Sequence, residues 1–297
     1  MATDQAFCAT SIPTLLSALQ EDNGERDELV IDIKLTEAAE LCELVQVELA
    51  LASNMSFKRL HLDQGCPDKL AFVIIQALQH NSVLKSFHFS DWAHTKSGDP
   101  MGLALAKALR HNSVLDSFHL EAMSANFRDP TGLALAEALR HNSVLKSFHL
   151  FAENTNFGDP TGLALAEALR HNSVLKSFRF YAAGNFFDDP TGLALAEVFD
   201  YNCTLLAFDA SISVLHMKKA QEGLRRNRQL LSGWRALAAI ARFVFGTGFK
   251  SLAQFHFRRA IFDFFLPAQW RPWPAADGQA LRIGQEPCSV SEARASR

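Results

Sequence analysis

Cysteine is scarce in this sequence, and so are the short motifs that mark enzymes. Only five of the 297 residues are cysteine, and their spacing matches neither a zinc-ligand pair nor a dense disulfide framework. The chain contains no G-x-S-x-G, P-loop, dinucleotide-binding fingerprint or H-E-x-x-H motif. We therefore expect a protein that is not an enzyme, with no catalytic residues and no cofactor.

Segments that would direct the chain into or through a membrane are also lacking. The first eleven residues contain neither a basic region nor an apolar stretch, so no conventional signal peptide is expected. The most apolar window, residues 230–245, is interrupted by Arg235 and Arg242, which argues against a transmembrane helix. The expected location is the cytoplasm or, after delivery, the inside of a host cell.

The sequence repeats itself with a period of about 30 residues. Residues 129–148 are identical to residues 159–178. The pentapeptide HNSVL and its degenerate form YNCTL begin at His80, His111, His141, His171 and Tyr201. Weaker copies extend the pattern, so about seven units of 27–31 residues are expected between Leu29 and Leu230. Self-similarity with a period in this range is typical of solenoids.

Each unit combines a strand pattern with a helix pattern. In one half, residues 145–150 follow L-x-x-L-x-L, which predicts a short strand. The other half predicts a helix over residues 159–170, with Asp159 as its N-cap and Pro160 at the first helical position. Asn172 follows the helix, and asparagine tolerates the left-handed conformation that ends many helices.

Neither half can bury its apolar face alone, so the units are expected to stack side by side. Stacking gives an α/β solenoid shaped like a horseshoe, with a parallel sheet on the concave face and helices on the convex face. We predict a monomer with an N-terminal capping segment over residues 1–28 and repeats over residues 29–230. A C-terminal helical cap or amphipathic module is predicted over residues 231–266, and a flexible tail over residues 267–297.

The units resemble the ribonuclease-inhibitor type of leucine-rich repeat, the longer class that contains a helix. Residues 161–169, TGLALAEAL, are also similar to the GALA-motif repeats of bacterial effectors that are delivered into plant cells. This chain has Thr161-Gly162 where those repeats usually have Gly-Ala, and residues 1–28 show no F-box. The resemblance covers about 200 of the 297 residues. It implies a leucine-rich-repeat solenoid that binds proteins, with a role as an effector on host proteins.

Side chains between the inward-facing positions of each strand are expected on the concave face. One column of them contains His61, His88, His119, His149, Arg179 and Asp209. A second column, just past each strand, contains Asp63, Ser90, Glu121, Phe151, Tyr181 and Ser211. Phe151 and Tyr181 are the preferred contacts, because exposed aromatic side chains often anchor protein interfaces. The predicted partner-binding residues are His88, His119, His149, Arg179, Phe151, Tyr181 and Glu121.

The stacked histidines allow three interpretations. They are a tolerated polar residue copied with the repeat, a patch that titrates near neutral pH, or metal ligands. Neighbouring strands are expected to supply no carboxylate or cysteine that would complete a zinc ligand set, so we predict no metal site.

Two further recurring positions are expected to be structural. Phe127, Phe157 and Phe187 share one phase of the loop between strand and helix, and should insert into the core. The histidines that begin the HNSVL motif should lie at helix C-termini, where a donor side chain caps free carbonyl groups.

Basic residues are concentrated near the C-terminus, although the formal net charge of the whole chain is −3. Residues 225–273 contain nine Lys or Arg and one acidic residue. The residues there that are predicted to contact a membrane or a partner are Trp234, Arg235, Arg242, Phe245, Arg258 and Arg259. The segment is interpreted either as a helical hairpin that packs on the last repeat or as a membrane-docking module. No binding of nucleic acid is expected, because the basic residues interleave with apolar ones.

The sequence therefore predicts a non-catalytic scaffold that binds a protein partner on its concave face. The alternative is a membrane-associated adaptor that docks through its basic, aromatic C-terminal helices.

Overall fold

The computed structural model describes residues 6–20, 27–33, 41–54, 56–63, 66–90, 98–185 and 187–245. Within these ranges one sheet is formed by β1 (Phe7–Ala9), β2 (Glu28–Ile31), β3 (Arg59–Leu62), β4 (Ser86–Ser90), β5 (Ser117–Glu121), β6 (Ser147–Phe151), β7 (Ser177–Tyr181) and β8 (Ala207–Ala210). The helices are α1 (Ile12–Gln20), α2 (Leu41–Ser53), α3 (Asp68–Leu78), α4 (Gly98–His111), α5 (Asp129–His141), α6 (Asp159–His171), α7 (Asp189–Tyr201) and α8 (Val214–Phe245).

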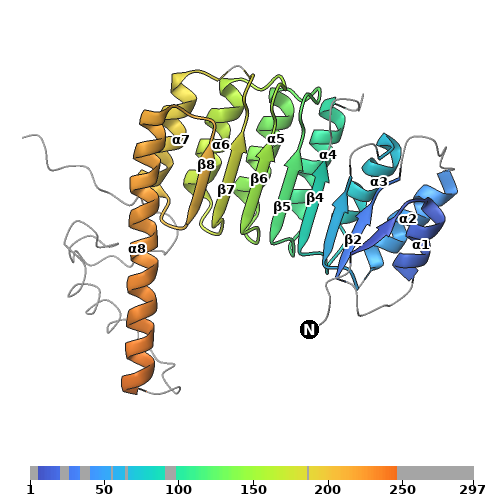
Figure 1. The fold of residues 1–297 in the computed structure, drawn as a ribbon, viewed down its shortest axis with the longest axis horizontal. Helices are drawn as coiled ribbons and strands as arrows, with labels where there is room; N and C mark the ends of the chain where they lie inside the picture. The colour runs from blue at the N-terminus through green and yellow to red at the C-terminus, as the bar shows by residue number, and fades with distance from the viewer. Residues whose placement is uncertain are drawn as a thin grey trace, which may run out of the picture.

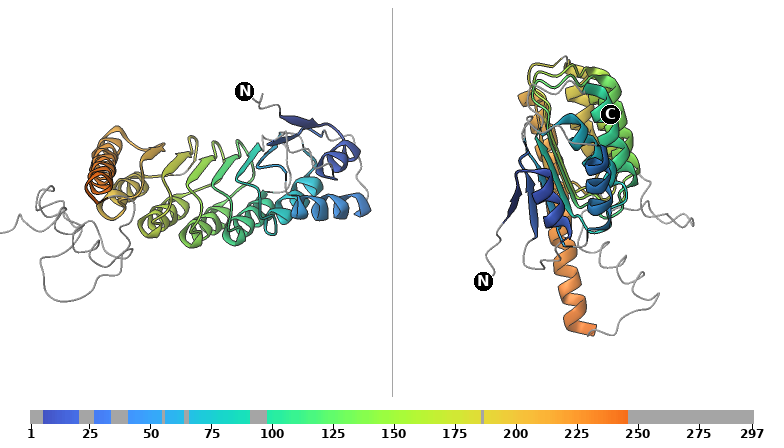
Figure 2. Two further views of the ribbon diagram at one scale, coloured as in Figure 1. Left: turned by 90° about the horizontal axis from the view of Figure 1, so that it is seen from below. Right: turned by 90° about the vertical axis from the view of Figure 1, so that its right-hand side faces the viewer.

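Strands and helices alternate along the chain, and each strand pairs in parallel with the next strand in sequence. Figures 1 and 2 show the strands in one layer and the helices in a second layer behind it. Helices are wider than strands, so stacking curves the layers and leaves the sheet on the concave face. The predicted fold, an α/β leucine-rich-repeat solenoid with helices on the convex face, is confirmed.

The sheet begins earlier in the chain than the repeat pattern suggested. β1 pairs with β2, with Cys8 opposite Val30, so the segment predicted as a cap also contributes a strand and a helix to the solenoid. At the other end, α8 runs without interruption through residue 230, where a boundary was predicted. Residues 224–230, the last of the range predicted to form repeats, are helical throughout.

The first half of α8 closes the end of the solenoid. Ala220 and Leu224 are buried, and Nδ2 of Asn227 donates to the backbone carbonyls of Asn202, at 3.0 Å, and Leu205, at 2.9 Å. A terminal unit must cover the apolar end of a repeat array. Here a single helix performs this role. Among the described residues, no helix has the length and apolar character needed to cross a membrane.

The core between the two layers is built from copies of the same side chains. Phe118, Phe148 and Phe178 come from successive strands and are fully or almost fully buried. Their ring centroids are 5.6 and 5.9 Å apart, with nearly parallel planes. Phe127 and Phe157, predicted to insert from the loops, are completely buried, and Phe187 packs against the core. That prediction is confirmed.

A column of buried asparagines joins each unit to the one before it. Nδ2 of Asn142 donates to the carbonyl of Leu109, at 2.7 Å, and to that of Asn112, at 3.2 Å. Its Oδ1 accepts from the backbone N–H groups of Val144 and Leu145, at 2.9 and 2.8 Å. One side chain therefore closes its own turn and satisfies carbonyl groups of the preceding unit.

The same pattern of bonds is made by Asn112, Asn172 and Asn202. The expectation that Asn172 adopts a left-handed conformation is wrong, because its φ is −77° and its ψ is 114°. Asparagine stands after each helix because its amide is both a donor and an acceptor.

Aspartates at the helix starts make a second connection between units. Oδ1 of Asp129 accepts from the backbone N–H of Gly158, at 2.9 Å, and from the hydroxyl of Thr161, at 2.6 Å. Asp159 bonds to the following unit in the same way. The prediction that Asp159 is an N-cap is therefore wrong. Gly158 occupies that position, and the carboxylate is directed at the neighbouring unit instead of its own helix.

In each of these helices a glycine follows the threonine near the helix start, because adjacent helices approach closely at that position. A Cβ added to Gly132 in α5 would lie 2.2 Å from Oγ1 of Thr161 in α6, and the neighbouring units repeat this contact. The Thr-Gly pair that distinguishes these repeats from the usual Gly-Ala is thus explained by helix packing. The threonine methyl and hydroxyl groups fill the space beside the glycine.

Replacing Asn142 with alanine is expected to lower the free energy of unfolding by about 2–4 kcal/mol. The change leaves several buried backbone groups without partners, and each such group costs about 1–3 kcal/mol. Urea unfolding followed by circular dichroism would measure it. The matched control is Ser143→Ala, at the adjacent exposed position. Equal stabilities of the two variants would contradict the role of the asparagine column.

Two glycine-to-alanine substitutions in helices should have opposite effects. Gly132→Ala should destabilise by about 1–3 kcal/mol, because overpacking forces the helices apart. Gly233→Ala in α8 should stabilise by up to about 1 kcal/mol, since nothing lies within 4 Å of the added Cβ and alanine favours helix. Thermal unfolding of both variants would test this. A stabilising effect at position 132 would refute the packing argument.

Candidate interaction surface on the concave face

The predicted columns of the concave face are confirmed by the pairing of the strands. His61, His88, His119, His149, Arg179 and Asp209 lie opposite one another along five consecutive pairs. Ser90, Glu121, Phe151 and Tyr181 do the same at the ends of their strands. Parallel strands lie about 4.8 Å apart, so each column brings its side chains into contact.

The rings of this face form a continuous stacked row. His88 lies between His61 and His119, with ring centroids 4.1 Å away on each side and nearly parallel planes. His119 also stacks on Phe151 at 5.1 Å, and Phe151 stacks on Tyr181 at 4.8 Å. The row therefore passes from the histidine column into the aromatic residues predicted as the main contacts.

His149 leaves this row and turns its edge toward His119, with the ring planes at 74°. Its Nε2 lies 3.1 Å from the hydroxyl of Ser147 and 3.2 Å from that of Ser177. Serines of two neighbouring strands thus fix the orientation of this ring, and Phe151 takes the stacking position beside His119.

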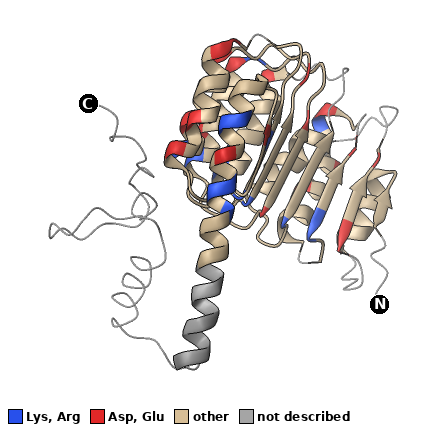
Figure 3. Cartoon of the chain, turned by 60° about the vertical axis from the view of Figure 1, so that its left-hand side comes forward, with Lys and Arg blue, Asp and Glu red and all other residues tan. Residues whose placement is uncertain are grey.

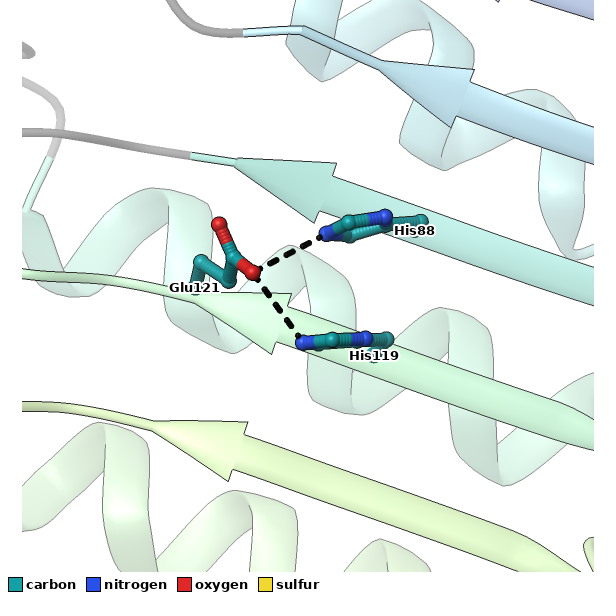
Figure 4. Close-up of side chains that lie close together, drawn as sticks. All are labelled: His88, His119 and Glu121. Atoms are coloured by element: carbon teal, nitrogen blue, oxygen red, sulfur yellow. Dashed lines mark ion pairs between the residues drawn. The ribbon is translucent and has the colours of Figure 1, made fainter. Parts of the chain in front are cut away.

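Glu121 lies beside two of the histidines. Its Oε1 is 3.6 Å from Nε2 of His88 and 3.4 Å from Nε2 of His119, as Figure 4 shows. Its Oε2 accepts a hydrogen bond from the hydroxyl of Ser90 at 3.1 Å. The sequence-based expectation that no carboxylate reaches the histidine column is therefore wrong. Glu121 belongs to the adjacent column, but its side chain extends diagonally across to the histidines.

The environment of the column favours neutral imidazoles. Burial, together with the neighbouring His119 and His61, lowers the pKa of His88 from 6.5 to about 4. Burial also lowers the pKa of His119 and that of His149, and for His149 the positive charge of Arg179 acts in the same direction. Both solvent exclusion and like-charge repulsion disfavour the protonated form. At neutral pH these rings therefore present lone pairs as well as N–H donors.

At the β7–β8 end of the concave face, the histidines give way to charged groups and to the phenol of Tyr181. The hydroxyl of Tyr181 donates to the carboxylate of Asp209, which raises the pKa of Tyr181. Arg179 is exposed between these groups and the histidines. The stacked pair of Phe151 and Tyr181 thus lies beside the exposed guanidinium group of Arg179 and the carboxylate of Asp209.

Two of the four predicted helix-end histidines make the carbonyl contact expected of them. Nδ1 of His111 lies 2.8 Å from the carbonyl of Lys107, and Nδ1 of His171 lies 3.0 Å from that of Glu167. Nε2 of His141 instead lies 2.7 Å from the carboxylate of Glu137. These histidines stabilise their own helices on the surface remote from the sheet.

One exposed feature was missed by the sequence reasoning. Four leucines on successive helices of the convex face are 43–45% exposed, namely Leu103, Leu133, Leu163 and Leu193. The signal was present as the leucine that follows glycine in each of the four GLALA motifs. The exposure of this leucine was hard to predict, because its position on the helix is adjacent to the buried apolar face.

Three basic residues in the described part of α8 contact the last repeat. Lys219 lies 3.5 Å from carboxylate oxygens of both Glu197 and Asp200 in α7. Nε of Arg228 donates to the carbonyl of Leu206 at 2.8 Å, and the guanidinium of Arg226 donates to the carbonyl of Phe199. Figure 3 shows these positive charges on the part of α8 beside the solenoid. This contact favours the interpretation as a packed cap for residues 214–233.

The candidate membrane contacts lie further along the chain. Trp234, Arg235, Arg242 and Phe245 are in α8, but the structure describes no side chains beyond Gly233. Arg258 and Arg259 lie outside the described residues. That these six residues contact a membrane or a partner therefore stays a prediction from the sequence.

No protein-family model matches the chain, and no curated protein matches its sequence. Among solved structures it is similar to one titled "Leiomodin-1 Actin-Binding Site 2 (ABS2)", at 18% identity and a TM-score of 0.49, covering 58% of this chain and 95% of that one. It is also similar to a tropomodulin C-terminal domain from Caenorhabditis elegans, at 12% identity and a TM-score of 0.36, covering 77% and 99%. The likeness is one of fold.

The neutral state of the histidine column predicts a loss of stability in acid. The folded chain resists protonation of His88 down to about pH 4, whereas the unfolded chain takes up that proton near pH 6.5. Stability should therefore fall as the pH falls from about 6.5 to 4, with about 1–3 kcal/mol attributable to this group.

His88→Gln should make that decline shallower, because glutamine does not titrate. Urea unfolding of both proteins at a series of pH values between 4 and 8 would measure the difference in slope. Parallel stability curves for the two proteins across this range would contradict the assignment.

Proposed function

We propose that the protein is a non-catalytic scaffold that binds a protein partner on the concave face of its sheet. The observation that carries this proposal is the stacked pair of Phe151 and Tyr181, whose ring centroids are 4.8 Å apart at an angle of 13°. Both side chains are half-buried on a face that no helix of the described structure covers.

The physical argument is that this pair is preorganised. Phe151 is held between His119 and Tyr181, and the Tyr181 hydroxyl is held by Asp209. A partner that binds here does not have to order these rings, so little conformational entropy is lost. Rigid aromatic side chains of this kind contribute a large share of binding energy at protein interfaces.

The flanking groups indicate what the partner should present. The rings offer apolar area for a partner's aliphatic or aromatic side chain. Glu121 contributes negative charge beside Phe151, whereas Arg179 and Asp209, which lie opposite each other, contribute one charge of each sign toward the β8 end. A segment with an apolar anchor flanked by charges of both signs would complement this surface.

A role as a bacterial effector that acts on host proteins is the finer form of this proposal. It is supported by the resemblance of the repeats to the GALA motif. The alternative, a membrane-associated adaptor, depends on the basic and aromatic residues beyond Gly233.

Substituting both rings should abolish partner binding without unfolding the protein. Phe151→Ala with Tyr181→Ala removes the apolar anchor, while the buried core and the asparagine column are untouched. Quantitative affinity capture followed by mass spectrometry should show proteins retained by the wild type and lost by this variant. For a partner so identified, the dissociation constant should rise at least about tenfold.

The control places the same kind of change on the opposite face. Leu133→Ala with Leu163→Ala removes exposed apolar side chains from the convex helices. This variant should retain the partner, and both variants should melt within a few degrees of the wild type. A partner lost from the convex variant and kept by the concave one would place the interface elsewhere.

A further inference from the structure

The most concentrated group of potential metal ligands in the described structure lies on the concave face. His88, His119 and Glu121 each offer one ligand atom, and these atoms lie within 4.8 Å of one another. They come from two adjacent strands, because His88 in β4 pairs directly with His119 in β5, and Glu121 follows two residues later on the same face. Figure 4 shows the carboxylate directed between the two rings.

The distances fit a coordination shell better than a set of hydrogen bonds. Oε1 of Glu121 is 3.4 and 3.6 Å from the two Nε2 atoms, which is long for a hydrogen bond. Zinc binds imidazole nitrogen and carboxylate oxygen at about 2.0–2.2 Å, so the ligand atoms of a tetrahedral site are about 3.4 Å apart. Oε1 of Glu121 therefore lies from each imidazole nitrogen at about the spacing expected between two ligands of one ion.

One of these ligand atoms lacks a hydrogen-bond partner in the described structure. Nε2 of His119 is buried and makes no hydrogen bond. An orphaned buried polar atom is costly, and a bound ion or other ligand would remove that cost.

The carboxylate also has the outer contact expected of a metal ligand. The hydroxyl of Ser90 donates to Oε2 of Glu121, and this leaves Oε1 directed at the histidines. Hydrogen bonds of this kind orient ligating groups and contribute to affinity. Ser90 comes from the same strand as His88, so the sheet itself fixes the arrangement.

The near-identity of the repeats shows how specific this arrangement is. In the next two strands, the position of Glu121 is occupied by Phe151 and Tyr181, neither of which suits such an ion. Nε2 of His149 is already engaged by two serines. Nε2 of His88 lies 3.3 Å from the hydroxyl of Ser90, a contact that a bound ion would replace. Within the described strands β4 to β7, a carboxylate lies beside two imidazoles only at the junction of β4 and β5.

We propose that His88, His119 and Glu121 bind a divalent transition-metal ion, with Zn²⁺ as the favoured occupant. Two imidazoles and one carboxylate form a three-ligand set that leaves a fourth position open. The side chains are 26–28% exposed, so that position faces the concave surface, where water or a side chain of a bound protein would complete the shell. Binding requires the stacked rings to tilt toward the ion.

The test is titration of the full-length, metal-stripped protein with zinc chloride, followed by isothermal calorimetry. The expected result is one tight site per chain, with at least tenfold weaker binding in Glu121→Gln and in His119→Gln. Replacing zinc with Co²⁺ should give the intense visible bands of four-coordinate cobalt in the wild type and not in these variants. Glu121→Gln preserves the shape of the side chain, so a folding defect in His119→Gln would leave a valid comparison.

The control is a close histidine–glutamate pair on the exposed side of α5. Nε2 of His141 lies 2.7 Å from a carboxylate oxygen of Glu137, but no second histidine accompanies them. His141→Gln should leave the tight site unchanged. The proposal is overturned if the wild type binds no zinc at stoichiometric concentration, or if Glu121→Gln binds it as tightly as the wild type. Because no partner protein is involved, this result is independent of the proposed scaffold function.

Discussion

The structure depends on one hydrogen-bonding arrangement, the column of buried asparagines between the helices and the strands. Every turn after a helix has backbone N–H groups to satisfy, and every preceding unit has carbonyl groups that water cannot reach. The asparagine amide meets both needs at once, which neither serine nor aspartate could do, since only an amide has two N–H donors beside an acceptor. Even at the end of the array, Asn227 makes the two donations from within a helix. The spacing between units is thereby fixed.

Once the spacing is fixed, the parallel strands must place identical positions side by side, about 4.8 Å apart. For phenylalanine this stacking is favourable and builds the core. For histidine it is favourable only while the rings are neutral, because adjacent positive charges would repel one another at that distance. The same geometric constraint therefore produces an apolar column inside and an uncharged imidazole column outside. His88, His119 and His149 thus bring donors, lone pairs and rings together without accumulating positive charge.

Much of this could be read from the sequence, and the exceptions share a cause. The periods of 2 and 3.6 residues located the strands and helices, and the repeat period aligned the columns. What failed were three inferences about the partner to which a polar side chain is directed. Asp159 and Asn172 were assigned local roles at their own helix ends, whereas both bond to another unit. Glu121 was assigned to its own column, whereas it contacts the neighbouring one. Local patterns carry no information on contacts between units, which exist only after stacking.

Comparing the repeats separates the positions that the scaffold requires from the positions that give the concave face its own chemistry. The asparagine, phenylalanine and serine positions are copied from unit to unit because stacking requires or tolerates them. The position at the strand ends is not copied, and it reads serine, glutamate, phenylalanine and tyrosine from β4 to β7. These four side chains lie on one rigid edge, beside a histidine column that is almost constant. The chemistry of the concave face therefore changes along the array through a single variable column, from a carboxylate with two imidazoles at one end to a stacked aromatic pair at the other. A ligand that distinguishes this solenoid from another with the same scaffold has to do so mainly through that column.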